Sequence, residues 1–396
     1  MSDRLLCCLK KYETCLALVF ASDFTFGLAR ANGTYDVVLG RLRKFALTRE
    51  KLYVLTTDAT HETLIPGRVE HIALGKFSFP KNPPFFVLTS TLSSMRSIFP
   101  LIRLRHRISA VVITPVFPVA LLLRYLVRLP IILCLPYYPG WHPSYGLLDL
   151  FKKITYMACV KSAVNVASLV IVPSRSLKQL VLHMGLEQEK ALLTTRFATN
   201  YERFTSWKST GVLRRKLEIN DNRKILIYHG RLTRLKGLDT LLKALALLPK
   251  NTFRLILIGR GPDEERLKHL AATLEILESV RFVGSMPNQD VCDYIGDADV
   301  YVFPSLTEGW PKSIIESMLM SKPIVASRIP GVTDLLEDER SALLFEPSNP
   351  RDLAAQIIRI SNDEALAKRL GEDARLNAMK LHANAVVEKA SLDVCL

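Results

Sequence analysis

Residues 224–237 read KILIYHGRLTRLKG. Its first six residues are a short, mostly apolar run that predicts a buried strand. The glycine-bounded segment GRLTRLKG predicts a turn, and residues 238–248, LDTLLKALALL, then carry apolar side chains at helical spacing. The stretch therefore predicts a strand that passes through one loop into a helix.

The same rhythm continues through the C-terminal half of the chain. Strands are predicted at 253–258, 280–283, 300–304 and 323–327, with amphipathic helices at 263–276, 289–298 and 312–320. Regular alternation of this kind requires parallel strands with helices on both faces of the sheet.

The N-terminal half shows a weaker form of the pattern. Its predicted strands lie at 16–21, 51–56, 111–114, 131–135 and 169–173, and its predicted helices at 37–46, 119–127 and 147–166. Residues 206–222 are polar and lack a pattern, which indicates a linker. We expect an α/β protein of two doubly wound, Rossmann-like domains, 1–205 and 223–396. They should face a cleft, where such sheets bind ligands at the strand carboxyl ends.

Length, cysteine content and the longest apolar region indicate the cellular compartment. With 396 residues and 49% hydrophobic content, the chain can build two cores. Its seven cysteines are scattered and include no C-x-x-C pair, which favours a reducing environment. The most apolar region, 108–138, is broken by Arg124, Arg128 and prolines, so we expect neither a membrane span nor a signal peptide. A cytoplasmic location is predicted.

Charge is distributed unevenly between the two halves. Residues 1–210 hold 27 Lys and Arg against 12 Asp and Glu, whereas residues 211–396 hold 26 of each kind. The net charge of +15 therefore belongs entirely to the first half. This difference indicates that the two halves face different partners.

The strongest chemical motif is EGWPKSIIE at residues 308–316, directly after the predicted strand 300–304. Pro311 is suited to start a helix, which leaves the amides of Lys312 and Ser313 free to bind an anion. Glu308 should look into the cleft, and Glu316 lies about one turn inside the helix. Carboxylates suit sugar hydroxyls and a helix N-terminus suits a phosphate. The alternative, that both glutamates are ordinary surface charges, remains open at this point.

Two further turns add to this motif. In GRLTRLKG, Arg231 and Lys236 bracket a loop that ends at a helix N-terminus, a suitable place for a diphosphate. For Arg234 we prefer a solvated surface position. In IGRGP, residues 258–262, Gly261 permits a close approach of the backbone.

Together these turns resemble glycosyltransferase family four, the retaining transferases with the two-domain GT-B fold. The similarity runs in order through most of the C-terminal half: HGRLTRLKG (229–237), LIGRGP (257–262), RFVG (281–284), ADV (298–300), PS (304–305), the E-x7-E segment (308–316), PIVA (323–326), PG (330–331) and LLFEP (343–347).

The resemblance implies a metal-independent hexosyltransferase that takes its sugar from a UDP- or GDP-sugar and needs no other cofactor. It implies that Arg231 and Lys236 bind the donor diphosphate, that Glu316 binds the ribose hydroxyls and that Glu308 meets the donor sugar. The backbone at Ser285 and Met286 should lie beside the base. The other binding residues that it implies are Gly33, Gly230, Gly261, Lys312 and Ser313.

The N-terminal half departs from the family pattern. Only Gly33 matches the usual Gly-Gly loop, and Pro136-Tyr137-Tyr138 stands where the family usually has a histidine. Two alternatives therefore stay open: a non-catalytic nucleotide-sugar-binding protein, and an epimerase-like enzyme. A nucleic-acid partner is not expected, because no basic stripe interleaved with aromatics is present.

Asp297-Ala298-Asp299 resembles the metal-binding D-x-D of another transferase class. We reject that interpretation, because the motif lies at a predicted helix-to-strand junction, where aspartates form turns. Arg231 and Lys236 would neutralise the diphosphate in place of a metal.

The basic first half predicts a membrane partner. Its contributors include Arg103, Arg105 and Arg107, and the helical run 147–166 with Lys152, Lys153 and Lys161 beside apolar residues. That apolar stripe could equally pack on the sheet. The domain-wide charge favours peripheral binding to the anionic inner face of the membrane, with a lipid or lipid-linked acceptor.

Overall fold

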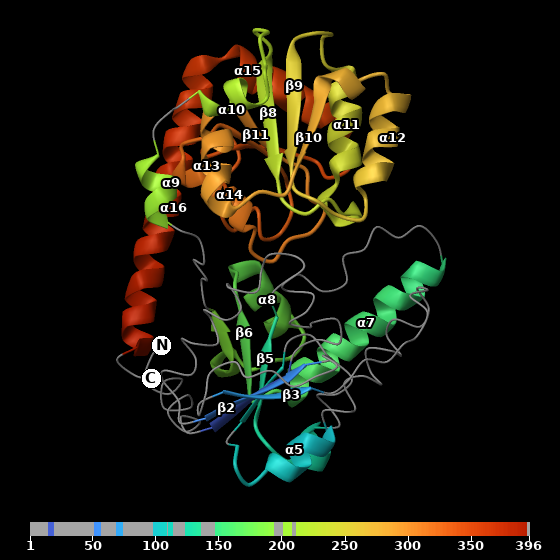
Figure 1. Cartoon of the computed structure of the whole chain (residues 1–396). Helices are drawn as coiled ribbons and strands as arrows, with labels where there is room; N and C mark the ends of the chain where they lie inside the picture. The colour runs from blue at the N-terminus through green and yellow to red at the C-terminus, as the bar shows by residue number, and fades with distance from the viewer. Residues whose placement is uncertain are drawn as a thin grey trace. The chain divides into compact units, whose positions relative to one another are not determined.

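The computed structural model describes residues 15–19, 51–56, 69–73, 98–108, 110–113, 123–135, 147–193, 201–207 and 211–393. The chain divides into two compact units, and the described residues between 201 and 387 belong to the second. Each unit is built on its own sheet (Figure 1). None of the helices in the described part is long and apolar enough to cross a membrane.

The first unit contains a seven-stranded parallel sheet in the order β3-β2-β1-β4-β5-β6-β7. The strands are β1 (Cys15–Val19), β2 (Lys51–Thr56), β3 (Val69–Ala73), β4 (Ala110–Ile113), β5 (Ile131–Cys134), β6 (Leu169–Val172) and β7 (Ala191–Leu193). The described helical segments are α5 (Ile98–Leu104), η2 (Leu123–Val127), α7 (Leu147–Val166), α8 (Arg175–His183) and η3 (Gln188–Lys190). Val160 and Val164 of α7 are buried in the core of this unit.

The second unit contains a six-stranded parallel sheet in the order β10-β9-β8-β11-β12-β13. Its strands are β8 (Lys224–His229), β9 (Phe253–Ile258), β10 (Val280–Gly284), β11 (Val300–Phe303), β12 (Ile324–Ser327) and β13 (Leu343–Phe345). Every residue of β9, β11 and β12 is buried. Such continuous burial is expected where helices cover both faces of a parallel sheet.

The described helices of the second unit precede, separate and follow its strands. They are α9 (Tyr201–Ser206), α10 (Val212–Lys216), η4 (Arg234–Lys236), α11 (Leu238–Leu247), α12 (Glu264–Thr273), η5 (Leu277–Ser279), α13 (Asn288–Asp297), α14 (Lys312–Leu319), α15 (Pro350–Asn362) and α16 (Glu364–Asp393). Residues 388–393 at the end of α16 are grouped with the first unit. Helices α11 and α12 lie side by side, while α9 packs against α14 and α10 against α13 (Figure 1).

The predicted pair of doubly wound α/β domains is confirmed. Predicted strands and helices in the second unit match the observed ones to within a few residues. Strands β3, β7 and β13 were not predicted, because β3 reads VEHIA and the other two have three residues each. The predicted helix at 37–46 lies outside the described residues, and of 119–127 the described part is the π-helical turn η2.

The predicted linker, 206–222, is part of the second unit. It contains α10, whose Leu213 is fully buried in the core of that unit. Trp207 packs on α13 so closely that a Cβ on Gly296 would lie 2.1 Å from the indole ring. Its indole N–H donates to Asp293 at 3.1 Å. The polar composition of this segment predicted a linker, but a few buried apolar residues are enough to pack a short segment onto the second unit.

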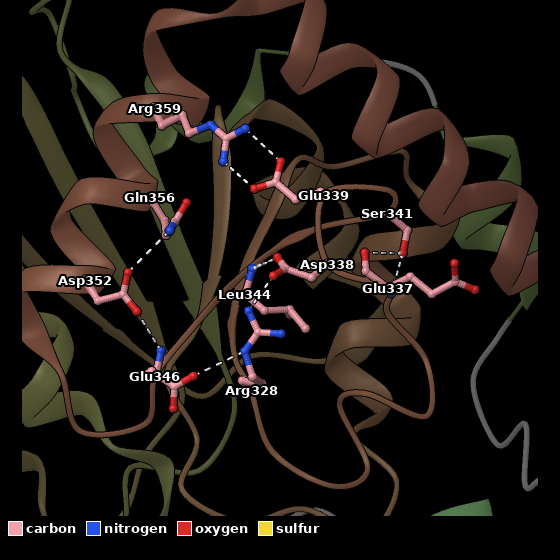
Figure 2. Close-up of polar contacts among 10 residues, drawn as sticks. All are labelled: Arg328, Glu337, Asp338, Glu339, Ser341, Leu344, Glu346, Asp352, Gln356 and Arg359. Carbon is pink, nitrogen blue, oxygen red and sulfur yellow. Dashed lines mark hydrogen bonds and ion pairs between the residues drawn. The ribbon is translucent and has the colours of Figure 1, made fainter.

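The segment that leads into β13 is held by charged contacts (Figure 2). Glu339 pairs with Arg359 of α15, with a 2.7 Å contact between Oε2 and an arginine nitrogen. Asp338 pairs with Arg328 and accepts the backbone N–H of Leu344 at 2.8 Å. These contacts fix a three-residue strand at the edge of the sheet.

Candidate functional site

The strand order of the second sheet indicates where a ligand would bind. The first strand of the unit in sequence, β8, lies between β9 and β11, so the chain winds outward in both directions from there. In open parallel sheets, ligands bind at such a switch point, outside the strand carboxyl ends. Here β8 ends at His229 and β11 ends at Phe303. The loops that follow these strands carry Arg231, Lys236 and Glu308.

The loops after β8 and β9 are joined by backbone hydrogen bonds. Gly230 N donates to Ile258 O at 2.9 Å, and Leu232 N donates to Arg260 O at 3.0 Å. A Cβ on Gly261 would lie 2.0 Å from Leu232 O. The close approach predicted at Gly261 is therefore made by the neighbouring loop. The two loops form one continuous floor.

Lys236 and Glu308 form an ion pair at the end of this floor. Ser305 donates to the same carboxylate oxygen of Glu308 at 2.8 Å. Gly237 follows Lys236 with φ +61°, and a Cβ there would lie 2.1 Å from Pro304 O. Glycine is thus required where the β8 loop passes the β11 loop. The two loops bring a cation and a carboxylate together from positions 72 residues apart in sequence.

The two arginines of the β8 loop differ in their surroundings. Arg234 is 63% exposed and lies 3.9 Å from Asp263. Arg231 is also exposed, and among the residues that the structure describes none forms an ion pair with it. Its carbonyl accepts the hydroxyl of Tyr228 at 3.2 Å, and burial holds the pKa of that hydroxyl above its ordinary value, with smaller contributions from Tyr301 and Glu308. Arg231 therefore presents a charged group from a fixed backbone.

Helix α14 begins at the same edge, directly after the β11 loop. Pro311 precedes its first residue, as predicted, and Lys312 and Ser313 form the first turn. The amides of a first helical turn have no partner within the helix. Glu316, one turn on, is buried and contacts His229 with 2.7 Å between Oε2 and Nε2.

Sequence reasoning did not single out His229. The residue is 7% exposed, and its ring meets the edge of Tyr301 with centroids 5.4 Å apart. Its signal in the sequence is weak, because a histidine at the end of a buried strand is usually a satisfied core residue. Its pairing with a glutamate 87 positions away becomes visible only in three dimensions.

The remaining predicted residues lie farther along the edge or outside the described part. Gly284, at the end of β10, accepts the Gly259 N–H at 2.8 Å, so the β10 loop continues the floor. Ser285, exposed, and Met286, half-buried, follow on that loop. Gly33 lies outside the described residues.

The D-x-D motif lies at the other edge of the sheet. Asp297 accepts the N–H groups of Gly211 and Leu213, both at 3.1 Å. Asp299 accepts the N–H of Ile225, near the start of β8, at 2.6 Å. Both carboxylates serve the backbone at the amino ends of the strands, as the predicted turn role requires. No group of side chains able to hold a metal ion was found in the described part of the chain.

Comparisons with known proteins agree with this geometry. Residues 210–377 match the family model "Glycosyl transferases group 1". An uncharacterized glycosyltransferase of Haemophilus influenzae is 32% identical over 206 residues, which cover 51% of this chain and 58% of the relative. A D-inositol 3-phosphate glycosyltransferase of Streptomyces bingchenggensis is 30% identical over 211 residues, covering 50% of this chain and 46% of the relative. The chain thus spans about half the length of the curated relatives it matches.

Two solved structures share the fold over almost the whole chain. Anabaena HepE in complex with UDP has a TM-score of 0.69 at 17% identity, covering 96% of this chain and 100% of HepE. Sucrose-phosphate synthase from Thermosynechococcus elongatus has a TM-score of 0.74 at 20% identity, covering 95% of this chain and 98% of the synthase. The two parallel-sheet units are those of the GT-B fold, and residues 210–377 are similar to the glycosyl transferases group 1 family.

Proposed function

We propose that the protein is a retaining, metal-independent hexosyltransferase that takes its sugar from a nucleotide-sugar donor. The observation that carries this proposal is the convergence of Arg231, Lys236, Glu308 and the first turn of α14 on the switch point of the second sheet. UDP complexes of HepE, and the group 1 match, support a nucleotide-sugar as the donor.

The nucleotide would lie along the floor made by the β8, β9 and β10 loops. Glycine at 230 and 261 lets the loops of this floor pass close to Tyr228 and to Leu232 O, and the backbone at Ser285 and Met286 would border the base. The amides of Lys312 and Ser313 and the guanidinium of Arg231 would bind the diphosphate. Glu316 would bind the ribose hydroxyls.

The Lys236–Glu308 pair would bind the donor sugar and stabilise the leaving group. Glu308 would accept hydroxyls of the donor sugar, and Lys236 would then turn its charge toward the diphosphate. The bond between the anomeric carbon and the diphosphate oxygen breaks, and the leaving electron pair stays on the diphosphate. The acceptor hydroxyl bonds to the same face of that carbon and gives its proton to the leaving phosphate. Positive charges placed beforehand stabilise the developing anion, without a divalent ion.

Two other functions keep the same donor site. A non-catalytic nucleotide-sugar-binding protein would bind the donor without turnover, and an epimerase-like enzyme would change the sugar without transfer. A panel of UDP- and GDP-sugars, assayed for release of the nucleoside diphosphate with and without acceptors, separates the three. Release that depends on an acceptor supports transfer. Binding of a donor with no turnover under any condition would contradict it.

We further propose that the acceptor is a lipid or lipid-linked molecule and that the protein is cytoplasmic and peripheral on the inner membrane face. Residues 71–148 contain eight Lys and Arg and not one Asp or Glu. Each basic residue near an anionic bilayer contributes on the order of 1 kcal/mol. This stretch alone therefore supports reversible attachment to an anionic surface.

The surface best suited to that contact combines α5 with η2, which pack against each other. Phe99 of α5 is 76% exposed and Tyr125 of η2 is 71% exposed. Arg103, Arg107 and Arg124 are exposed beside them. Exposed aromatics among arginines favour the headgroup region of a bilayer. On α7, Ile154 is 58% exposed whereas Met157 packs on the core, so α7 provides a weaker surface.

Co-sedimentation with phosphatidylcholine vesicles, with and without phosphatidylglycerol, tests the membrane proposal. Binding should require the anionic lipid and weaken at high salt, because salt screens the attraction. Phe99→Ser with Tyr125→Ser should reduce it, whereas Leu376→Ser, at a residue 54% exposed on α16, should not. Equal binding by both variants would contradict the α5–η2 surface. Lack of binding at low salt would contradict the membrane proposal and leave the donor site unaffected.

A further inference from the structure

The contact between His229 and Glu316 is the most deeply buried side-chain pair described in the candidate site. The side chains are 9% and 8% exposed, and 2.7 Å separates Nε2 from Oε2. A carboxylate taken out of water is unfavourable unless a donor meets it. His229 provides such a donor from β8, a strand that is not adjacent in sequence to α14.

The hydrogen bond fixes which ring nitrogen carries a proton. A carboxylate oxygen only accepts, so Nε2–H must donate to Glu316. Nδ1 is buried, and none of the described residues forms a hydrogen bond with it. In the neutral ring it keeps a lone pair, so the Nε2–H tautomer is the form that leaves no buried N–H without an acceptor. Among the described residues, Glu316 is therefore the hydrogen-bond partner of the imidazole.

The ring itself is held in place from a second strand. Tyr301 of β11 lies in edge contact with it, with the ring planes at 61°. Gly230, directly after His229, has φ +148°, and its N–H is bonded to Ile258 O. His229 thus has little freedom to swing away from Glu316. Rigid support of this kind is what a ligand-binding carboxylate needs to hold its direction.

We propose that His229 is a positioning residue, which orients the Glu316 carboxylate so that the site selects ribose over deoxyribose. The inference rests on the proposed function, in which Glu316 binds the ribose hydroxyls. Without the Nε2–H donor, Glu316 would lose one of the contacts that set its direction and with it much of its discrimination, while the diphosphate contacts of Arg231 and Lys236 would remain.

Calorimetric titration with UDP and 2′-deoxy-UDP, and in parallel with GDP and 2′-deoxy-GDP, tests the proposal. His229→Phe keeps a ring against Tyr301 but removes the donor. A hydrogen bond to a charged group contributes about 1.5–3 kcal/mol, so ribonucleotide affinity should fall roughly ten- to a hundred-fold. The deoxynucleotide should lose much less, so the preference for ribose should collapse. A purely structural role would weaken both nucleotides equally.

Three further variants complete the test. His229→Gln retains an N–H donor and should restore part of the ribose preference. Tyr301→Phe keeps the ring contact and should leave the preference unchanged. The double variant Glu316→Gln with His229→Phe should lose no more ribonucleotide affinity than either single variant, because both changes disrupt the same His229–Glu316 pair. Circular dichroism and thermal melts confirm that each variant is folded.

The outcomes separate the inference from the proposed function. If the wild type binds none of the nucleotides, the proposed function fails. If it binds them and His229→Phe retains the full preference for ribose, or if His229→Gln rescues nothing, the positioning role is wrong while the donor site stands.

Discussion

The two edges of the second sheet use the same residue types in different ways. At the amino edge, Asp297 and Asp299 accept backbone N–H groups, and Lys322 donates to the carbonyls of Gly296 and Ala298. At the carboxyl edge, Lys236 pairs with Glu308 and His229 with Glu316. Charges bound to the backbone are committed to the fold. Side chains that pair with each other from separate segments, as at the carboxyl edge, can exchange a partner for a ligand.

The largest effect should come from the carboxyl edge. Lys236→Ala and Arg231→Ala each remove a cation that would stabilise the leaving diphosphate. Turnover should fall roughly ten- to a thousand-fold, as for loss of one such group. Thermal melts should change little for Arg231→Ala, because that side chain is exposed. Steady-state transfer assays measure the effect, with Arg234→Ala as the control. Full activity in both Lys236→Ala and Arg231→Ala would contradict the catalytic role proposed for the carboxyl edge.

The amino edge should respond in stability instead. Asp297→Ala removes the acceptor for two backbone N–H groups at the start of α10. Loss of a helix-capping side chain costs roughly 1–2 kcal/mol of unfolding free energy. Urea denaturation should show that loss, while transfer measured well below the melting temperature should stay near the wild-type rate. A large loss of turnover without a loss of stability would assign this motif a role in the reaction.

Lys322, at the amino edge, should make the free energy of unfolding depend on pH in the alkaline range. Burial lowers the pKa of its ammonium from 10.5 to about 8, against the opposing effect of Asp299 and Asp297. Between these two values the unfolded chain binds more protons than the folded one, so this group's contribution to stability rises with pH there. The slope is at most about 1.4 kcal/mol per pH unit. Urea titrations from pH 7.5 upward should show the rise against Lys322→Arg, which stays charged; parallel curves would contradict it.

The smallest expected effect is that of metal removal. In the proposed site, Arg231 and Lys236 would supply the positive charge at the carboxyl edge, and the aspartates of the D-x-D motif are bound to backbone at the other. Transfer should therefore be the same in excess EDTA as without it. Recovery of lost activity by added Mg²⁺ or Mn²⁺ would show that the carboxyl edge is incomplete without an ion.

The sequence predicted the second unit well for a physical reason. Its strands are continuous apolar runs and its helices are amphipathic, so local pattern and tertiary burial agree. Glu308, Lys236 and the start of α14 could be singled out because each lies in, or directly after, a loop that follows a predicted strand. His229 was missed because its partner, Glu316, is 87 residues away. The segment 206–222 was assigned as a linker because Leu213 and Trp207 are too few to create a periodic pattern.

The hydrogen bonds between the loops after β8, β9 and β10 bear on the thermodynamics of ligand binding. Gly230, Leu232 and Gly259 tie these loops together before any ligand arrives. A ligand that settles on them need not first order the chain, so the entropic cost of binding is reduced. Nucleotide association should then be fast, with little change in backbone amide exchange in these three loops. Any slow step would have to arise elsewhere in the protein.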